Sequence, residues 1–232
     1  MKRNLNFFSF WLYIVLSTTI VLFNSCDLLE VPQEEEIVPE EPKELKEPNP
    51  TEGTEVIING VTWATRNLAA PGVFAANIHD FGLYYQWNRK SGWSATDPLK
   101  NSDGGTIWDN TSRTDISWTK INDPSPAGWR VPTRNEINSL INKDKVLIEW
   151  TTLKGVKGSL FTDKASQKSL FLPAAGNRSR HDGALEYAGK GYYWSSVMHN
   201  NDYVYYLFFD NNGTMEYSCF RNFGQSIRCV KE

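Results

Sequence analysis

Cysteine and histidine are scarce in this chain of 232 residues, which holds three of each. The histidines, His79, His181 and His199, stand far apart, and the sequence has neither a His-x-x-x-His nor a Cys-x-x-Cys spacing. A zinc site needs at least three converging nitrogen, sulfur or oxygen ligands. The sequence therefore predicts no metal site on these residues.

Motifs of catalysis and cofactor binding are also missing. The sequence contains no Gly-x-Ser-x-Gly, no glycine-rich loop that would cradle a phosphate, and no Ser, His and Asp trio that spacing singles out. Its most distinctive motifs are built from Trp, Gly, Pro and Tyr, which form surfaces and turns and do not transfer protons. We expect a protein that is no enzyme and carries no cofactor.

The charge of the chain argues against a nucleic-acid partner. The formal net charge is −3, to which residues 1–25 contribute +2 and residues 26–55 contribute −9, and this leaves +4 for residues 56–232. That excess is spread over many segments, whereas nucleic-acid binding needs a clustered basic face. We expect no nucleic-acid partner.

Residues 1–25 have the pattern of a secretory signal. Two basic residues precede apolar runs at 7–16 and 20–23, and Ser25 stands before Cys26. This pattern resembles bacterial lipoprotein signals, which implies that Cys26 is acylated and becomes the first residue of the mature protein. Two or three acyl chains would hold the protein stably on a membrane. An uncleaved membrane anchor with an incidental cysteine is the alternative, because the apolar run is nearly long enough to span a bilayer.

Residues 26–55 are predicted to form an acidic, extended tether. They contain eleven acidic residues, two lysines and five prolines. Like charges and prolines cannot collapse into a core, so we expect this segment to be solvated. In polyproline form, at about 3.1 Å per residue, it would hold the following domain up to roughly 90 Å from the lipid.

Residues 56–232 are predicted to form one domain with many antiparallel strands. Asn59-Gly60 stands between two β-branched runs and predicts a hairpin, because both turn residues need a positive φ. Further strands are expected at residues 83–87, 170–172, 192–194, 203–210, 214–219 and 225–230, with a tight turn at 211–213. The last third of the chain therefore predicts an antiparallel meander.

One helix is predicted after Pro132. Thr133 and Glu136 have the spacing of a capping box, in which a hydroxyl and a carboxylate each satisfy a backbone N–H of the first turn. Apolar residues follow on one face, and the helix is expected to end near residues 142–143. Stretches such as 88–127 lack a steady period and are expected to be ordered loops. The predicted fold class is α+β with a high loop content.

Six short motifs occur in fixed order along this domain. They are Trp63–Leu68, Gly82–Trp87, Ala127–Thr133, Leu170–Gly176, Tyr193–Ser196 and Arg228–Val230. With them, residues 56–232 resemble the Fibrobacter succinogenes major paralogous domain of bacterial surface proteins, and more distantly the C-terminal domain of the Legionella collagen-like adhesin. The resemblance implies a C-type-lectin-like fold, in which the N- and C-terminal strands pair and a loop-rich half projects away from them.

The resemblance also bears on the cysteines. Many relatives carry a cysteine where this chain has Ser125, so a bridge from that position to the position of Cys229 cannot form here. With Cys26 acylated, Cys219 and Cys229 remain. They form a disulfide if residues 225–230 fold back on the strand before them, and the alternative is two unpaired buried thiols.

The aromatic residues supply the candidate ligand contacts. The motif residues Trp63, Trp129 and Trp194 are flanked by strand or turn residues and are expected in the core. Other tryptophans lie in polar loops, and aromatic rings stack on sugars. The loops at 78–119 and 177–189 are expected to carry the contacts, through Trp93, Trp118, Asp182 and Tyr187.

Four residues carry side-chain oxygens that could bind calcium, namely Asp202, Asp210, Asn211 and Asn212. Lectin-type folds often bind calcium through carboxylates and amides. Asn and Asp also favour tight turns by themselves, and this interpretation is preferred here. No metal site is therefore predicted.

Together these features predict a lipid-anchored binding or adhesion module of the outer membrane or cell surface, which engages an extracellular glycan or a surface protein. A structural or accessory subunit of a surface assembly, without a soluble ligand, is the alternative. A third reading is an oxidoreductase that works through Cys219 and Cys229.

Overall fold

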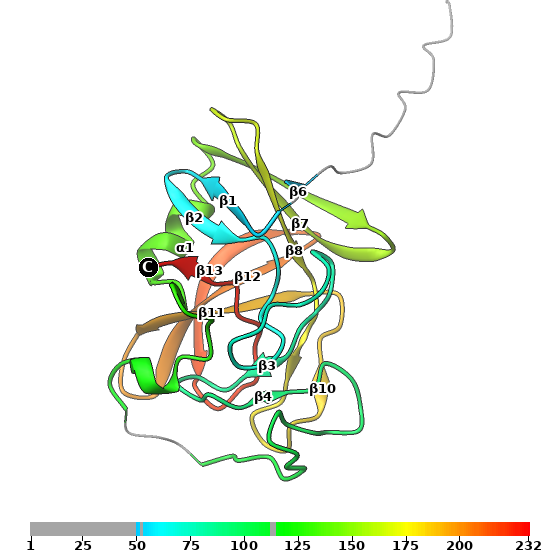
Figure 1. Ribbon diagram of the computed structural model, residues 1–232, viewed down its shortest axis with the longest axis vertical. Coiled ribbons are helices and arrows are strands. Elements are labelled where there is room, and N and C mark those ends of the chain that lie inside the picture. Colours follow the sequence, from blue (N-terminus) through cyan, green and yellow to red (C-terminus); the bar gives the residue numbers. More distant parts are fainter. Residues whose placement is uncertain (1–49, 52, 112–114) are drawn as a thin grey trace, which may run out of the picture. The chain divides into compact units, whose positions relative to one another are not determined.

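The computed structural model describes residues 50–51, 53–111 and 115–232 (Figure 1). The predicted leader, Cys26 and most of the predicted tether lie outside these residues. Antiparallel strands, loops and one α-helix make up the described part, which confirms the α+β prediction. No helix among the described residues is long and apolar enough to cross a membrane.

The first strands form the predicted hairpin, β1 (Glu55–Ile58) and β2 (Val61–Ala64). Its turn residues Asn59 and Gly60 have φ angles of 46° and 79°, as an Asn-Gly hairpin turn requires. β14 (Val230–Lys231) pairs with β2, and β5 (Trp129–Arg130) pairs with β14. This sheet, in the order β1-β2-β14-β5, joins the two ends of the described domain.

A second sheet was only partly predicted. It consists of β6 (Val146–Leu153), β7 (Val156–Asp163) and β8 (Ser169–Pro173). Only β8 was expected. The β6–β7 turn is Lys154-Gly155, with φ angles of 49° and 82°. Asparagine is the residue that usually marks such a left-handed turn position in a sequence, and here a lysine occupies it.

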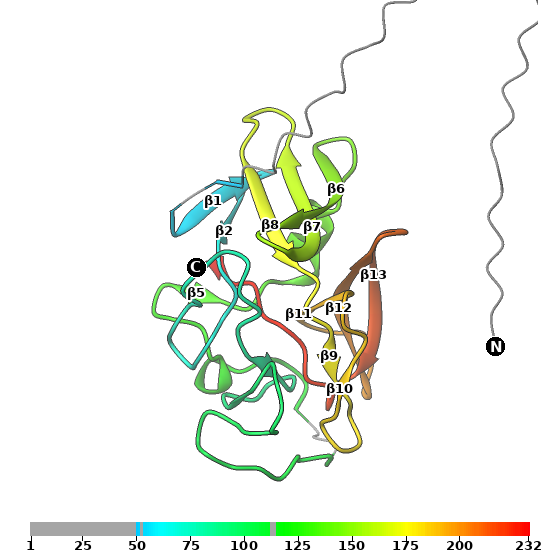
Figure 2. The same cartoon turned by 90° about the vertical axis from the view of Figure 1, so that its right-hand side faces the viewer.

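The predicted meander forms the third sheet, with β11 (Gly191–Met198), β12 (Tyr203–Asp210) and β13 (Gly213–Phe220) in that order (Figure 2). The expectation that residues 225–230 continue it is wrong. The chain at residues 224–226 makes single bridges to Arg178, Tyr85 and Tyr193 and then enters β14. It therefore passes through the interior of the domain and does not lie beside β13.

Helix α1 (Arg134–Leu140) begins as predicted. The Thr133 side chain accepts from the Glu136 N–H, and the Glu136 carboxylate accepts from the Thr133 N–H at 2.7 Å, which completes the capping box. Its buried residues Ile137 and Leu140 face the core. The helix stops before residues 142–143, because the chain turns there into β6.

The loop-rich half contains short pairs only. These elements are β3 (Tyr84–Tyr85), β4 (Gly92–Trp93), the 3-10 helix η1 (Lys120–Asn122), β9 (Asn177–Arg178) and β10 (Leu185–Glu186). β3 pairs with β4, and β9 with β10. Buried aromatic side chains and buried arginines hold this half in place.

Arg228 connects the two halves from inside. Its guanidinium is buried and donates to Asn67 Oδ1 at 3.0 Å, to Ala64 O at 3.2 Å and to Phe171 O at 3.1 Å. Burial lowers its pKa to about 10, so the group still carries its charge at neutral pH. Its acceptors come from β2, from the following loop and from β8, so the C-terminal segment is tied to all three.

Candidate functional site

One face of the β11–β13 meander carries a group of aromatic side chains. Side chains alternate along a strand, so Tyr206 and Phe208 lie opposite Leu207 and Phe209, which are buried in the core. Across the sheet Tyr206 pairs with Tyr217, and Phe208 pairs with both Tyr192 and Met215. We define the aromatic face as Tyr187, Tyr192, Tyr206, Phe208, Met215 and Tyr217.

Ring contacts make the aromatic face continuous. The ring centroids are 6.0 Å apart for Tyr187 and Tyr192, 5.9 Å for Tyr192 and Tyr206, and 6.3 Å for Tyr206 and Tyr217. Phe208 lies 5.3 Å from Tyr192 and 5.9 Å from Tyr217. The rings therefore form one packed surface across all three strands.

The ends of the aromatic face are the most open to solvent. Tyr187 is 57% exposed, Tyr217 50% and Met215 40%, while Tyr192 lies buried between them. Scattered apolar residues are normal on a protein surface, whereas a contiguous apolar patch marks a contact surface. The aromatic face exposes apolar surface at its two ends, while Tyr206 between them packs against a buried cluster.

Polar groups border this surface. Lys190 Nζ lies 5.8 Å from the Tyr187 ring centroid and 5.9 Å from that of Phe208, within reach of a cation–π attraction, and 4.0 Å from Asp210 Oδ2. Burial raises the pKa of the hydroxyls of Tyr192 and Tyr206, which therefore stay protonated at neutral pH. The aromatic face thus combines ring surface with hydrogen-bond donors and a carboxylate acceptor.

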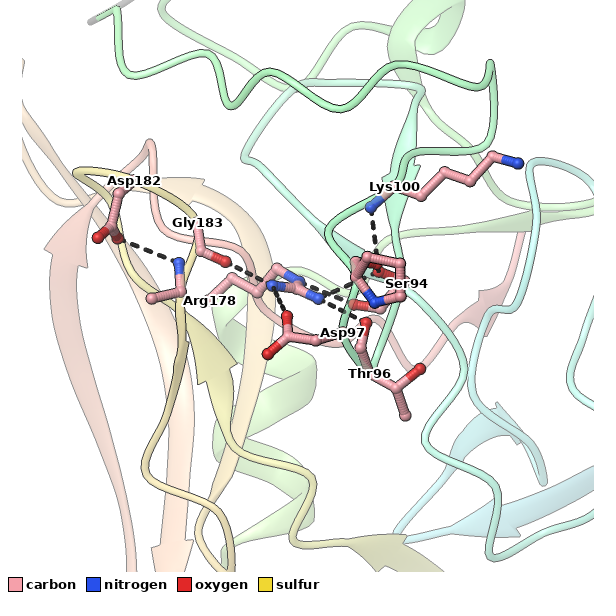
Figure 3. A network of polar contacts seen from close by, with 9 residues as sticks. Ser94, Thr96, Asp97, Lys100, Arg178, Asp182 and Gly183 are labelled. Carbon is pink, nitrogen blue, oxygen red and sulfur yellow. Dashed lines mark hydrogen bonds and ion pairs between the residues drawn. The ribbon is translucent and has the colours of Figure 1, made fainter.

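Arg178 fastens together the two loops that the sequence singled out as contact loops. Its buried guanidinium donates to Ser94 O and to Thr96 O, both at 2.8 Å, and to Gly183 O at 2.5 Å (Figure 3). The nearest carboxylate oxygen belongs to the exposed Asp97, at 3.5 Å. The positive charge of Arg178 is therefore stabilised by carbonyl oxygens of both loops. Separation of the loops would break these hydrogen bonds and leave the buried charge without its acceptors.

The prediction that Trp93 contacts a ligand is wrong. Its side chain is buried, with its ring centroid 4.9 Å from that of Trp108. Gly183 covers Trp108 so closely that a Cβ on it would lie 2.6 Å from the indole. Trp93 and Trp108 therefore form the packing beneath the two joined loops, and their polar sequence surroundings did not reveal this burial.

Asp182 lies exposed on the loop that Arg178 holds (Figure 3). Its Oδ1 accepts from the Ala184 N–H at 3.1 Å, and this hydrogen bond is the main cause that lowers the pKa of Asp182. The carboxylate thus shapes the turn around Gly183. Whether it also contacts a ligand stays a prediction.

Trp118 lies apart from the aromatic face, at a cleft of about 340 Å³. Its ring is partly buried, 5.6 Å from that of Trp87, and its Nε1 donates to Asn122 O at 3.2 Å. The cleft is lined by Trp118, Lys120, Asp123, Ser125, Pro126, Ala127, Gly128, Trp129, Arg130 and Glu232. Of the four predicted contact residues, the structure therefore places only Tyr187 on the aromatic face.

The disulfide between Cys219 and Cys229, which the sequence left open, is not formed, and both are free thiols. Residues 225–230 do not pair with β13, so the geometry that would join the sulfurs is missing. Burial raises the pKa of Cys229 to about 12 and also raises that of Cys219. Neither sulfur is therefore a ready nucleophile at neutral pH.

Of the four residues considered for calcium, Asp210 uses its carboxylate in the β12–β13 turn, where its Oδ1 accepts from the Asn212 N–H at 2.8 Å. Asp202 takes part in a turn through its backbone N–H, which donates to Asn200 Oδ1 at 3.0 Å. Among the described residues, no group of three or more His, Cys, Asp or Glu side chains is placed to hold a metal ion.

The sequence reasoning missed Tyr206, Phe208 and Tyr217, although a signal was present. Residues 203–210 are apolar or aromatic at nearly every position, so both faces of that strand carry large side chains. A meander strand that covers a core needs only one such face. Here the second face packs in part against another buried cluster, through Val204 and Tyr206, and its edge at Tyr217 stays exposed.

No protein-family model, curated protein or solved structure matches this chain.

Proposed function

We propose that this chain is a lipid-anchored surface module whose aromatic face binds extracellular glycans without catalysis. The observation that carries the proposal is the exposure of Tyr187 and Tyr217 at the two ends of a continuous ring surface. Sugar rings present C–H faces that stack on aromatic rings, and their hydroxyls pair with donors and acceptors. The tyrosine hydroxyls, Lys190 and Asp210 supply such groups beside the rings.

The proposal includes a C-type-lectin-like fold at the cell outer membrane or cell surface. Two features support that fold, namely the pairing of β2 with β14 near the two ends of the domain and the loop-rich half beyond it. The signal pattern ending at Cys26 and the acidic segment after it support the location. Acylation at Cys26 would make the membrane itself one of the partners.

A glycan array tests the binding. Full-length protein in detergent should recognise a defined set of glycans, and Tyr187→Ala and Tyr217→Ala should each weaken that recognition because each removes an exposed ring. Leu147→Ala is the matched control, since Leu147 is 46% exposed but belongs to β6 in the second sheet. Equal binding by all variants, or no glycan bound by the unchanged protein, would refute the proposal.

The second candidate is an accessory subunit of a surface assembly that has no soluble ligand. It is favoured by the outer edge of β13, which ends the meander and pairs with no other strand among the described residues. Crosslinking of whole cells separates the candidates, because a subunit yields a different protein in constant ratio, and a glycan receptor does not.

A further inference from the structure

Strand β13 is a long edge strand without the usual protection. It pairs with β12 in unbroken register from Tyr203 and Phe220 to Asp210 and Gly213, and it ends its sheet. Native edge strands are commonly blocked by lysine, proline, a bulge or short length. β13 has eight residues and none of these, and its one charged residue, Glu216, is paired with Arg134 at 2.9 Å.

The turn fixes which backbone groups of β13 point outward. Two residues separate Asp210 from Gly213, so this pair closes the hairpin with mutual hydrogen bonds, and such pairs recur at every second residue. The N–H and C=O groups of Thr214, Glu216 and Ser218 therefore point away from β12. Among the described residues, no other strand pairs with β13 on that side (Figure 2).

We propose that β13 pairs with β13 of a second copy of this chain, antiparallel, about a two-fold axis at Tyr217. This axis overlaps residues 214–220, as long an overlap as any axis allows and equalled only by an axis at Glu216. It pairs outward Glu216 with outward Ser218 of the other copy. An axis at Glu216 would set two carboxylates against each other, which destabilises a sheet. Axes at residues other than Glu216 and Tyr217 shorten the overlap. The strand is therefore most complementary to a second copy of itself when the axis lies at Tyr217.

The same axis extends the aromatic face. A two-fold axis perpendicular to the sheet puts the same face of both copies on one side. Tyr217 then lies beside Tyr217 of the second copy, and Met215 beside Cys219, at the separations of directly opposed side chains. Two aromatic faces become one surface across six strands. The pairing itself does not depend on what that surface binds.

Cysteine crosslinking in cells tests the register. In the full-length protein, Tyr217→Cys should give a disulfide-linked dimer on non-reducing gels, because position 217 faces itself across the axis. Tyr187→Cys is the matched control, since Tyr187 is also exposed on the aromatic face but lies beyond β11, and it should stay monomeric. A monomer with Tyr217→Cys, or equal dimer with both variants, would overturn the proposal.

Charge exchange gives a second, independent measurement. Tyr217→Lys and Tyr217→Glu should each lose the dimer in sedimentation of the detergent-purified full-length chain, because each puts like charges opposite one another. Mixed in equal amounts, the two should recover a heterodimer. A dimer that survives in both single variants, or a mixture that stays monomeric, would also overturn the proposal. Glycan arrays on the same variants report separately on the proposed function.

Discussion

Ser125 Oγ lies 3.2 Å from Cys229 Sγ. The serine stands in the loop before β5, and the cysteine stands directly before β14, which pairs with β5. The two side chains are therefore in direct contact although they lie far apart along the chain.

Ser125→Cys should create a disulfide bridge to Cys229. The loop to be closed spans 104 positions, and a disulfide of that span should stabilise the domain by about 2–4 kcal/mol, chiefly by restricting the unfolded chain. Urea unfolding with and without reductant measures the gain, and thiol titration shows whether one free thiol remains in the domain. Ser125→Ala is the control, and its stability should not respond to reductant. Three free thiols in the cysteine variant, from positions 125, 219 and 229, would show that the bridge does not form.

Arg178→Met should loosen the two joined loops. The substitution keeps much of the side-chain volume but leaves the buried carbonyl oxygens of Ser94, Thr96 and Gly183 without their donor. We expect a loss of roughly 3 kcal/mol in urea unfolding, since buried unpaired acceptors are costly, and faster amide exchange in both loops. Lys231→Met, which breaks the exposed pair with Glu55, should cost at most about 1 kcal/mol. Equal losses in the two variants would contradict the role of Arg178.

Asp163 should make the domain acid-sensitive. Its carboxylate accepts from the N–H groups of Ser166 and of Asn59, each at 2.7 Å, and these hydrogen bonds lower its pKa. A lowered pKa contributes stability above the unfolded-state value, about 3.9, and this contribution is lost as the pH falls through the folded-state value. Asp163→Asn should therefore unfold more easily at pH 7 and lose less stability on acidification. A variant with the same pH profile as the unchanged protein would exclude this role.

Gly191→Ala should destabilise the start of β11. A Cβ at this position would overlap the buried ring of Phe209 on the neighbouring strand. We expect a cost of about 1–3 kcal/mol, as for other overpacked cores. Phe209→Leu removes the obstructing ring, so the double variant should lose less than the sum of the two single losses. Additive losses would mean that the two positions do not contact each other.

Local signals in the sequence were reliable where neighbouring residues decide the conformation. Asn59-Gly60 formed its turn, and Thr133 and Glu136 formed their capping box, because the groups involved lie within a few residues of each other. The β6–β7 hairpin escaped prediction because its turn is Lys-Gly. The path of residues 225–230 was not predicted because its partners lie far away along the chain, as with Arg228 and Ala64, which are 164 positions apart.

For the candidate site, Tyr187 was the one predicted contact residue that lies on the aromatic face, and the other members were missed. Trp93 was predicted at the surface because its neighbours in the sequence are polar. In the structure its ring packs on that of Trp108, which Gly183 covers in turn. The burial of Arg178 and Arg228 was not predicted, although Arg228 lies in one of the six motifs, because an arginine is expected at the surface unless distant carbonyls accept its hydrogen bonds.

The sequence by itself determined the α+β class, the first hairpin, the start of α1 and the meander, since each follows from short-range turn chemistry and alternation. Only the tertiary structure decided that the two cysteines stay apart, which loops Arg178 joins, and that six side chains from β11–β13 and the turn before them make one surface. Those outcomes depend on which residues distant in the chain come into contact, and burial and hydrogen bonding select such contacts only when the whole domain is packed.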